Sequence, residues 1–215
     1  MRNESKSPIH VFGQTLGLTR REVNILTRLD TPEKIQDYVS SVKNNQEPEG
    51  DTCLSVREVL RQKRAHCIEG AFVAAAALWL QGYPPLLMDM KAKGDDDHVV
   101  ALVRRGRYWG AISKSNHVWL RWRDPVYRSL RELAMSYLHG YVSDCNHISL
   151  RSYSRPFDLR RFDPSLWITN EESCWDIAWD LDQSHHYELV TPSQARNLRP
   201  HDAIQLRAGE IVEHP

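Results

Sequence analysis

The stretch KRAHCIEGAFVAAAALWLQGY, from Lys63 to Tyr83, decides the fold of this chain. Its segment from Cys67 to Gln81 is rich in Ala, Leu and Phe and has almost no polar residues. That pattern predicts a helix that is buried on all sides. Gly82 marks its end, and the prolines of "YPP" favour an extended chain beyond it. Cys67 is therefore expected at the N-terminus of a core helix.

Capping signals predict shorter helices on the N-terminal side of the core helix. Thr19 precedes "RREVNILT", whose apolar residues recur at helical spacing. Thr31 followed by Pro32 is a typical start for "EKIQDYVSSV". Ser55, with Glu58 three residues later, indicates a capping box before "VREVLRQK".

Three short apolar runs follow the core helix and predict a sheet. They are "LLMDMKA", "HVVALVRR" and "RYWGAIS", separated by the turn sequences "KGDDD" and "RGR". Runs of this length with such turns are typical of consecutive antiparallel strands. The next segment, "DPVYRSLRELAMSYLHGYV", has the pattern of an amphipathic helix behind a proline.

The fold class that these patterns indicate is α+β, with N-terminal helices and a buried, Cys-led helix packed on an antiparallel sheet. We expect residues 1–149 to form this core and residues 150–215 to form a small C-terminal appendage of helix and strand. Within the appendage, Asn170 is the expected cap of a helix in "EESCWDIAWDLDQ".

Composition limits the classes of protein to consider. The chain has 215 residues, enough for one sizeable core, and its 28 basic and 28 acidic residues balance. This balance is unlike that of a dedicated nucleic-acid binder. The N-terminal "MRNESKSPIHVFG" has no apolar region of a secretory signal, and the longest apolar run is too short to span a bilayer. Four cysteines without a CxxC motif point away from a zinc site. We expect a cytoplasmic protein without a nucleic-acid or membrane partner.

A helix that begins with Cys67, followed by a strand that begins with His98, is an arrangement suited to nucleophilic catalysis by a thiol. A thiol at a helix N-terminus is close to the positive end of the macrodipole and to unpaired backbone N–H groups. Both favour the thiolate and lower the pKa of a thiol below about 8.5. A histidine on a neighbouring strand can take the thiol proton and later give it to a leaving group.

With these features the chain resembles the transglutaminase-like superfamily, which is related to the papain-like cysteine proteases. The resemblance covers roughly Leu54 to Tyr141 and rests on "HCIEGAFVAAAALWLQGY", "DDHVVALV" and "GRYWGAIS". It implies acyl transfer or amide hydrolysis through a thioester, on a peptide or a small amide or thioester, without a cofactor. It assigns Cys67 as the nucleophile and His98 as the general base. Tyr108–Trp109 matches the aromatic pair before the third catalytic residue.

The third catalytic residue departs from the pattern of the superfamily. The acid would fall at or just after Ile112, where this chain has "SKSN" and no Asp. Ser113 occupies the aligned place, whereas Asn116 is the better chemical substitute, because an amide oxygen can accept a hydrogen bond from the imidazole. The resemblance therefore leaves both residues as candidates for orienting His98.

Structural interpretations compete with these functional ones. Cys67 can be a buried thiol, and His98 can be a turn residue after "GDDD". The missing Asp after Trp109 also leaves open a non-catalytic interaction module that kept the fold and lost the acid. His66 is expected to be accessory or on the surface. We expect Cys53, Cys145 and Cys174 to serve packing only. The groups "DDDH", "CNH" and His185–His186 are interpreted as surface chemistry, and no metal site is expected.

Overall fold

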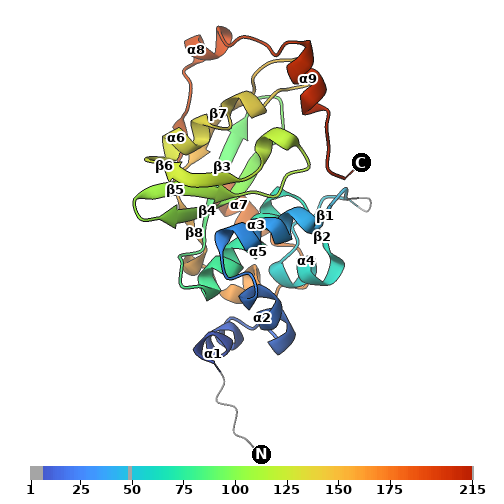
Figure 1. Ribbon diagram of the computed structural model, residues 1–215, viewed down its shortest axis with the longest axis vertical. Coiled ribbons are helices and arrows are strands. Elements are labelled where there is room, and N and C mark those ends of the chain that lie inside the picture. Colours follow the sequence, from blue (N-terminus) through green and yellow to red (C-terminus); the bar gives the residue numbers. More distant parts are fainter. Residues whose placement is uncertain (1–6, 48–49, 215) are drawn as a thin grey trace, which may run out of the picture.

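The computed structural model describes residues 7–47 and 50–214 (Figure 1). Residues 1–6, which contribute to the prediction that no secretory signal is present, lie outside this part. The helices are α1 (Pro8–Thr15), α2 (Arg20–Thr27), α3 (Pro32–Ser41), α4 (Val56–Gln62), α5 (Cys67–Leu80), α6 (Leu130–Met135), α7 (Trp175–Asp182), α8 (Pro192–Arg196) and α9 (Ala203–Gly209). The strands are β1 (Lys43–Asn44), β2 (Arg64–Ala65), β3 (Leu86–Ala92), β4 (His98–Arg105), β5 (Tyr108–Ile112), β6 (Arg123–Tyr127), β7 (Leu150–Ser154), β8 (Phe157–Asp158) and β9 (His186–Glu188).

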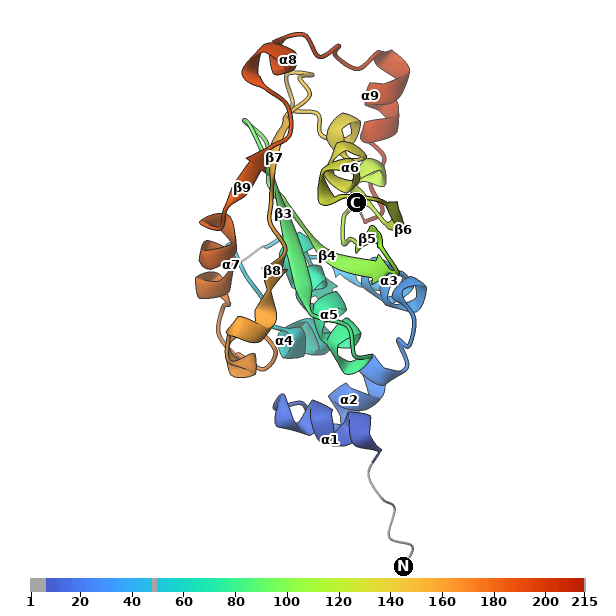
Figure 2. The same cartoon turned by 90° about the vertical axis from the view of Figure 1, so that its left-hand side faces the viewer.

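The main sheet is antiparallel, and the fold is α+β as predicted. Its strands run in the order β6-β5-β4-β3-β7-β9, and β8 also pairs with β3. Helix α5 packs on β4, and every residue of α5 except Cys67 and Trp79 is buried. Figure 2 shows α7 and α6 on opposite sides of β3 and β4. The core therefore has two parts, one on each face of the sheet.

Alternation along the strands explains the two parts of the core. On β4, Val99, Ala101 and Val103 pack with α5, whereas Val100 and Leu102 pack with α6. Successive strand residues point to opposite faces, so a sheet covered on both sides needs an unbroken apolar run. "HVVALV" supplies this run, and His98 therefore begins the strand on the α6 face.

Several capping predictions are confirmed. The Thr19 hydroxyl accepts from the Glu22 backbone N–H at 3.3 Å, and the Ser55 hydroxyl accepts from Glu58 in the same way at 3.3 Å. The capping box at Ser55 is incomplete, because the Glu58 carboxylate binds Arg61 and Gln62 instead. The three strands predicted after the core helix are β3, β4 and β5.

The long helix predicted in "DPVYRSLRELAMSYLHGYV" is wrong in its first part. Residues 123–127 form strand β6 on the edge of the sheet, and helix α6 begins only after the N-cap Ser129. The edge strand approaches β5 closely at Gly110, where a Cβ would lie 2.6 Å from the carbonyl oxygen of Arg123. An edge position also tolerates Pro125, which lacks a backbone N–H.

The C-terminal region contributes to the core more than the sequence suggests. Strands β7 and β8 pair with β3, and the buried Trp167 stacks on Trp79 at a centroid distance of 6.1 Å. Asn170 does not cap a helix there. Its side chain accepts from the Glu172 backbone N–H in a turn, and α7 starts at Trp175. Helices α8 and α9, at the top of Figure 1, contain no buried residue, although Ala195 of α8 packs against the core on the α6 face.

Candidate active site

Cys67 begins helix α5 because the preceding segment turns the chain sharply. Helix α4 ends at Lys63, whose backbone is left-handed with φ 56°, and strand β2 then pairs in parallel with β1. His66 is the N-cap residue of α5, and its backbone N–H donates to the Glu69 carboxylate at 2.8 Å. The Cys67 thiol is thus partly buried at the positive end of a 14-residue helix.

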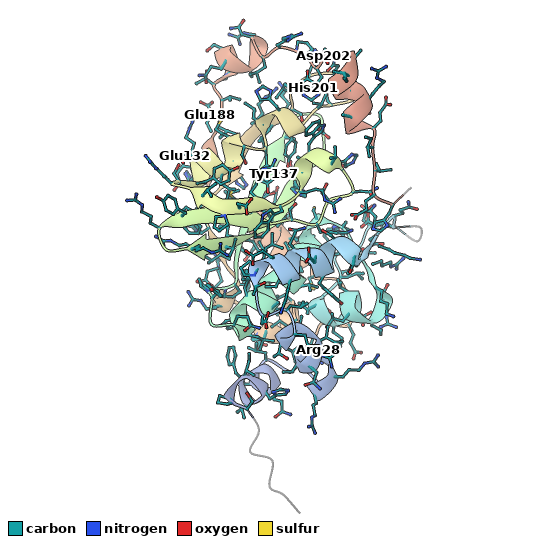
Figure 3. The ribbon with its side chains drawn as sticks, in the orientation of Figure 1. Arg28, Glu132, Tyr137, Glu188, His201 and Asp202 are labelled. Carbon is teal, nitrogen blue, oxygen red and sulfur yellow. The ribbon has the colours of Figure 1, made fainter. Side chains whose placement is uncertain are left out.

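His98 opens strand β4, and its buried imidazole lies against Ser113. The Nε2 atom of His98 and the Oγ atom of Ser113 are 2.8 Å apart. The Ser113 hydroxyl donates its single hydrogen to the carbonyl oxygen of Leu120, so it accepts from His98 Nε2–H. This tautomer leaves Nδ1 of His98 as the basic atom. The ring of Tyr137, near the middle of the molecule in Figure 3, lies 6.4 Å from the imidazole.

The two candidates for orienting His98 occupy different places. Ser113 directly continues β5 and contacts the imidazole, whereas Asn116 lies three residues further along the loop. The Asn116 amide instead binds the C-terminal segment: its Oδ1 accepts from the His214 backbone N–H at 2.8 Å. Its Nδ2 donates to the His214 carbonyl oxygen at 3.0 Å. The structure therefore brings Ser113, and not Asn116, to the histidine.

Three residues not expected to have a role from the sequence hold the loop that begins at Ser113 against helices α3 and α5. The Gln36 side chain bonds both backbone groups of Ser113, accepting at 2.8 Å and donating at 2.9 Å. The Lys114 ammonium donates to the carbonyl oxygen of Val42 at 2.6 Å. Gly70 lets the loop approach, because a Cβ there would lie 2.4 Å from Lys114 Cβ. A glycine inside a helix costs stability and often marks a close approach of another segment. Gly70 could therefore have indicated from the sequence that a loop packs closely on this helix.

His66 lies beside Cys67 and not on the outer surface as expected. Its Nε2 is 2.8 Å from the carbonyl oxygen of Thr52 and 3.4 Å from an oxygen of each of Glu47 and Glu69. The Glu69 carboxylate is fully buried, and it accepts from the Thr52 hydroxyl at 2.7 Å as well as from the His66 backbone. Burial of a carboxylate is tolerated where several donors satisfy it.

The two histidines control the charge of Cys67. Burial alone would raise the pKa of the thiol, but hydrogen bonds from His66 and His98 and their positive charges lower this pKa to about 5. Burial alone would lower the pKa of His66, but the hydrogen bond and charge of Cys67 and the charge of Glu69 raise it to about 9. At neutral pH the site therefore holds a thiolate beside an imidazolium.

The other cysteines differ from Cys67. Cys53 and Cys174 are buried, and burial raises the pKa of both thiols well above the ordinary value. Cys145 is exposed. Low thiol pKa marks reactive cysteines, whereas a buried thiol with a raised pKa is inert. Of Cys53, Cys67 and Cys174, only Cys67 has a lowered thiol pKa, which is the electrostatic property of a reactive cysteine.

A second cluster of titratable groups lies near the start of β4, because Asp97 directly precedes His98 and Asp89 on β3 pairs with Val99. One carboxylate oxygen from each of Asp89, Asp97 and Asp182 lies within 4.8 Å of the others, which is close enough for a metal ion. Basic side chains already contact two of them: Lys91 binds Asp182 at 2.6 Å, and Nε2 of His186 is 3.1 Å from Asp89. These contacts give the carboxylates partners without an ion.

No protein-family model matches the chain, and no curated protein matches it. The transglutaminase-like resemblance accordingly rests on the quoted residues and stays a prediction. Within residues 7–47 and 50–214, no helix has both the length and the apolar character needed to cross a bilayer. The most apolar helix, α5, has 14 residues, whereas a span takes about 20.

Proposed function

We propose that the protein is a transglutaminase-like cysteine hydrolase or acyltransferase that acts on an amide or thioester through a thioester at Cys67. One observation carries the proposal: the thiol of Cys67, a half-buried residue at a helix N-terminus, interacts with two imidazoles, those of His66 and His98. The buried thiols of Cys53 and Cys174 have no such partners. Packing alone therefore does not account for the surroundings of Cys67.

In the first half of the proposed reaction, the Cys67 thiolate attacks the carbonyl carbon of the acyl donor. A C–S bond forms, and the π electrons of the carbonyl move onto its oxygen. Unpaired backbone N–H groups in the first turn of α5 stabilise this oxyanion. His98, whose Nδ1 has taken the thiol proton of Cys67, then donates that proton to the leaving amine or thiolate as its bond to carbon breaks. The product is an acyl thioester on Cys67.

In the second half, water or an amine attacks the thioester. Nδ1 of His98 takes the proton of the attacking group, the new C–O or C–N bond forms, and the C–S bond breaks to restore the Cys67 thiolate. Ser113 holds the ring throughout, because its hydroxyl accepts from Nε2–H. Water gives hydrolysis and an amine gives acyl transfer.

The test is to trap the acyl-enzyme. We would incubate the protein with an activated aryl ester and with a thioester, and locate any added acyl group by mass spectrometry of the intact chain and its peptides. We expect one acyl group on Cys67, no acylation in Cys67→Ala, and normal acylation in Cys145→Ala, which removes the exposed thiol. His98→Ala should lower turnover by at least about 100-fold.

An absence of acylation, or acylation confined to Cys145, would contradict the proposal. The alternative would then be a non-catalytic interaction module that retains the fold. That module has a specific observation in its favour: Ser113 stands where the superfamily has a charged acid, and a neutral hydroxyl stabilises an imidazolium less than a carboxylate does.

A further inference from the structure

The surroundings of the two histidines differ in charge. His98 faces the neutral hydroxyl of Ser113 through Nε2. His66 faces the carboxylates of Glu47 and Glu69 at 3.4 Å, and the carbonyl oxygen of Thr52 at 2.8 Å. A carbonyl oxygen only accepts, so Nε2 of His66 carries a hydrogen, and Nδ1 is the atom left to share a proton with Cys67.

Opposing effects act on a positive charge at His66. The N-terminus of α5 disfavours a cation, but this effect is weak. Two carboxylates at 3.4 Å favour the cation, and Coulomb attraction at that separation is several times stronger than the effect of the helix dipole. The adjacent Cys67 thiolate adds to this attraction. The carboxylates and the thiolate outweigh the helix dipole, so the cation is the favoured form of His66.

We infer that His66 is a second functional histidine of this site, a fixed imidazolium that keeps Cys67 as a thiolate while His98 alone moves protons. The inference rests on the proposed function and adds that the two histidines have different roles in it, His66 as a fixed cation and His98 as the residue that transfers protons. A histidine held between carboxylates is poorly suited to release its proton in each cycle, whereas His98 has the neutral hydroxyl of Ser113 at its Nε2. The negative charge that the superfamily places beside its catalytic histidine is found here beside His66.

Other titratable groups packed around the pair do not change this assignment. Cys53 and Tyr141 interact electrostatically with Cys67, but burial raises the pKa of both, so both are neutral at pH 7. Among the residues that the structure describes, the titratable groups that face His66 and Cys67 are then Glu47 before α4, Glu69 on α5 and His98 on β4. The pH response of Cys67 thus reports on the two histidines and the two carboxylates.

The test is the pH dependence of Cys67 alkylation by iodoacetamide, read as the midpoint of the rate profile. The midpoint is the proper measure because a thiolate of lower pKa is also a weaker nucleophile, which partly cancels the change in rate. In His66→Gln we expect the midpoint to rise by at least one pH unit, a tenfold change in thiolate fraction. In His98→Ala the midpoint should stay well below about 8.5 although turnover is lost. His66→Lys, which restores a cation, should return the midpoint toward the wild-type value.

His147→Gln is the matched control, because this histidine is exposed and is not among the groups that act on the Cys67 thiol, so the midpoint should stay unchanged. Glu47→Gln gives a second variant with an intact imidazole, and its midpoint should rise by less than that of His66→Gln. An unchanged midpoint in both variants, with wild-type unfolding curves, would overturn the inference. Failure of the proposed function would look different: the midpoint would rise in His66→Gln while no substrate acylates Cys67.

Discussion

Replacing Gly70 with Ala tests whether the first turn of α5 sets the position of the residue that holds His98. The new Cβ would lie 2.4 Å from Lys114 Cβ and 2.9 Å from its Cγ, so the loop beginning at Ser113 has to move. Overpacking of this kind costs about 1–3 kcal/mol. Removing a glycine from a helix returns about 1 kcal/mol. We expect a net loss of about 0–2 kcal/mol in the free energy of unfolding, which leaves the protein folded.

The effect on catalysis should exceed what this loss of stability implies. Ser113 is adjacent to Lys114, and its displacement weakens the 2.8 Å contact with His98. A hydrogen bond of this kind contributes about 0.5–1.5 kcal/mol. We therefore expect kcat/KM for the acyl donor to fall roughly 2- to 12-fold at 25 °C. Stopped-flow acylation and urea unfolding of the same preparations would measure the two effects.

Gly13→Ala is the matched control for Gly70→Ala. A Cβ at Gly13 would lie 2.5 Å from a methyl group of Val23, a similar overlap, but in helix α1. This variant should lose stability and keep its kcat/KM. The reasoning is refuted if Gly70→Ala retains wild-type kcat/KM, or if Gly13→Ala loses as much activity at equal loss of stability.

Three more predictions concern the site. Ser113→Ala removes the acceptor for His98 Nε2–H and should lower kcat roughly 2- to 12-fold, measured with saturating substrate. Asn116→Ala breaks only contacts with the His214 backbone, so kcat/KM should stay within about twofold; a loss of 100-fold would instead make Asn116 the residue that orients the imidazole. The lowered pKa of Cys67 adds stability above the pKa of the unfolded thiol, and this stability is lost as the pH falls through about 5. The raised pKa of His66 adds stability below its unfolded value, which is lost as the pH rises through about 9. Melting temperatures of wild type and Cys67→Ala across this range should therefore differ in their pH dependence, and parallel curves would contradict the ion pair.

Local sequence signals predicted much of the fold that positions the site. The start of α5 at Cys67 and the start of β4 at His98 follow from composition and alternation over a few residues. The role of Gln36 does not, because its partner Ser113 lies 77 residues away along the chain. A contact of that separation depends on how α3 packs beside β5, which no local pattern encodes.

The surroundings of His66 show a second limit of sequence reasoning. Neighbouring positions inside a helix point about 100° apart, which suggested that His66 faces away from Cys67. As the N-cap residue, however, His66 has an extended backbone with φ −97° and ψ −166°, so helical periodicity does not fix the direction of its side chain. Its carboxylate partner Glu47 comes from a separate segment, before α4. The direction expected for the His66 side chain therefore does not hold at the boundary of the helix, and its role as accessory or functional residue stays a prediction.

The pairing of β3 has a consequence for how the protein is made. Strand β3 lies between β4, which follows it within a few residues, and β7, which begins only at Leu150. During synthesis the chain therefore carries an open β3 edge until β7 has left the ribosome. An open strand edge is a template for pairing with other chains. The nascent chain is open to such pairing in the interval when its site helix and His98 strand already exist, and a ribosome pause before residue 150 would prolong that interval.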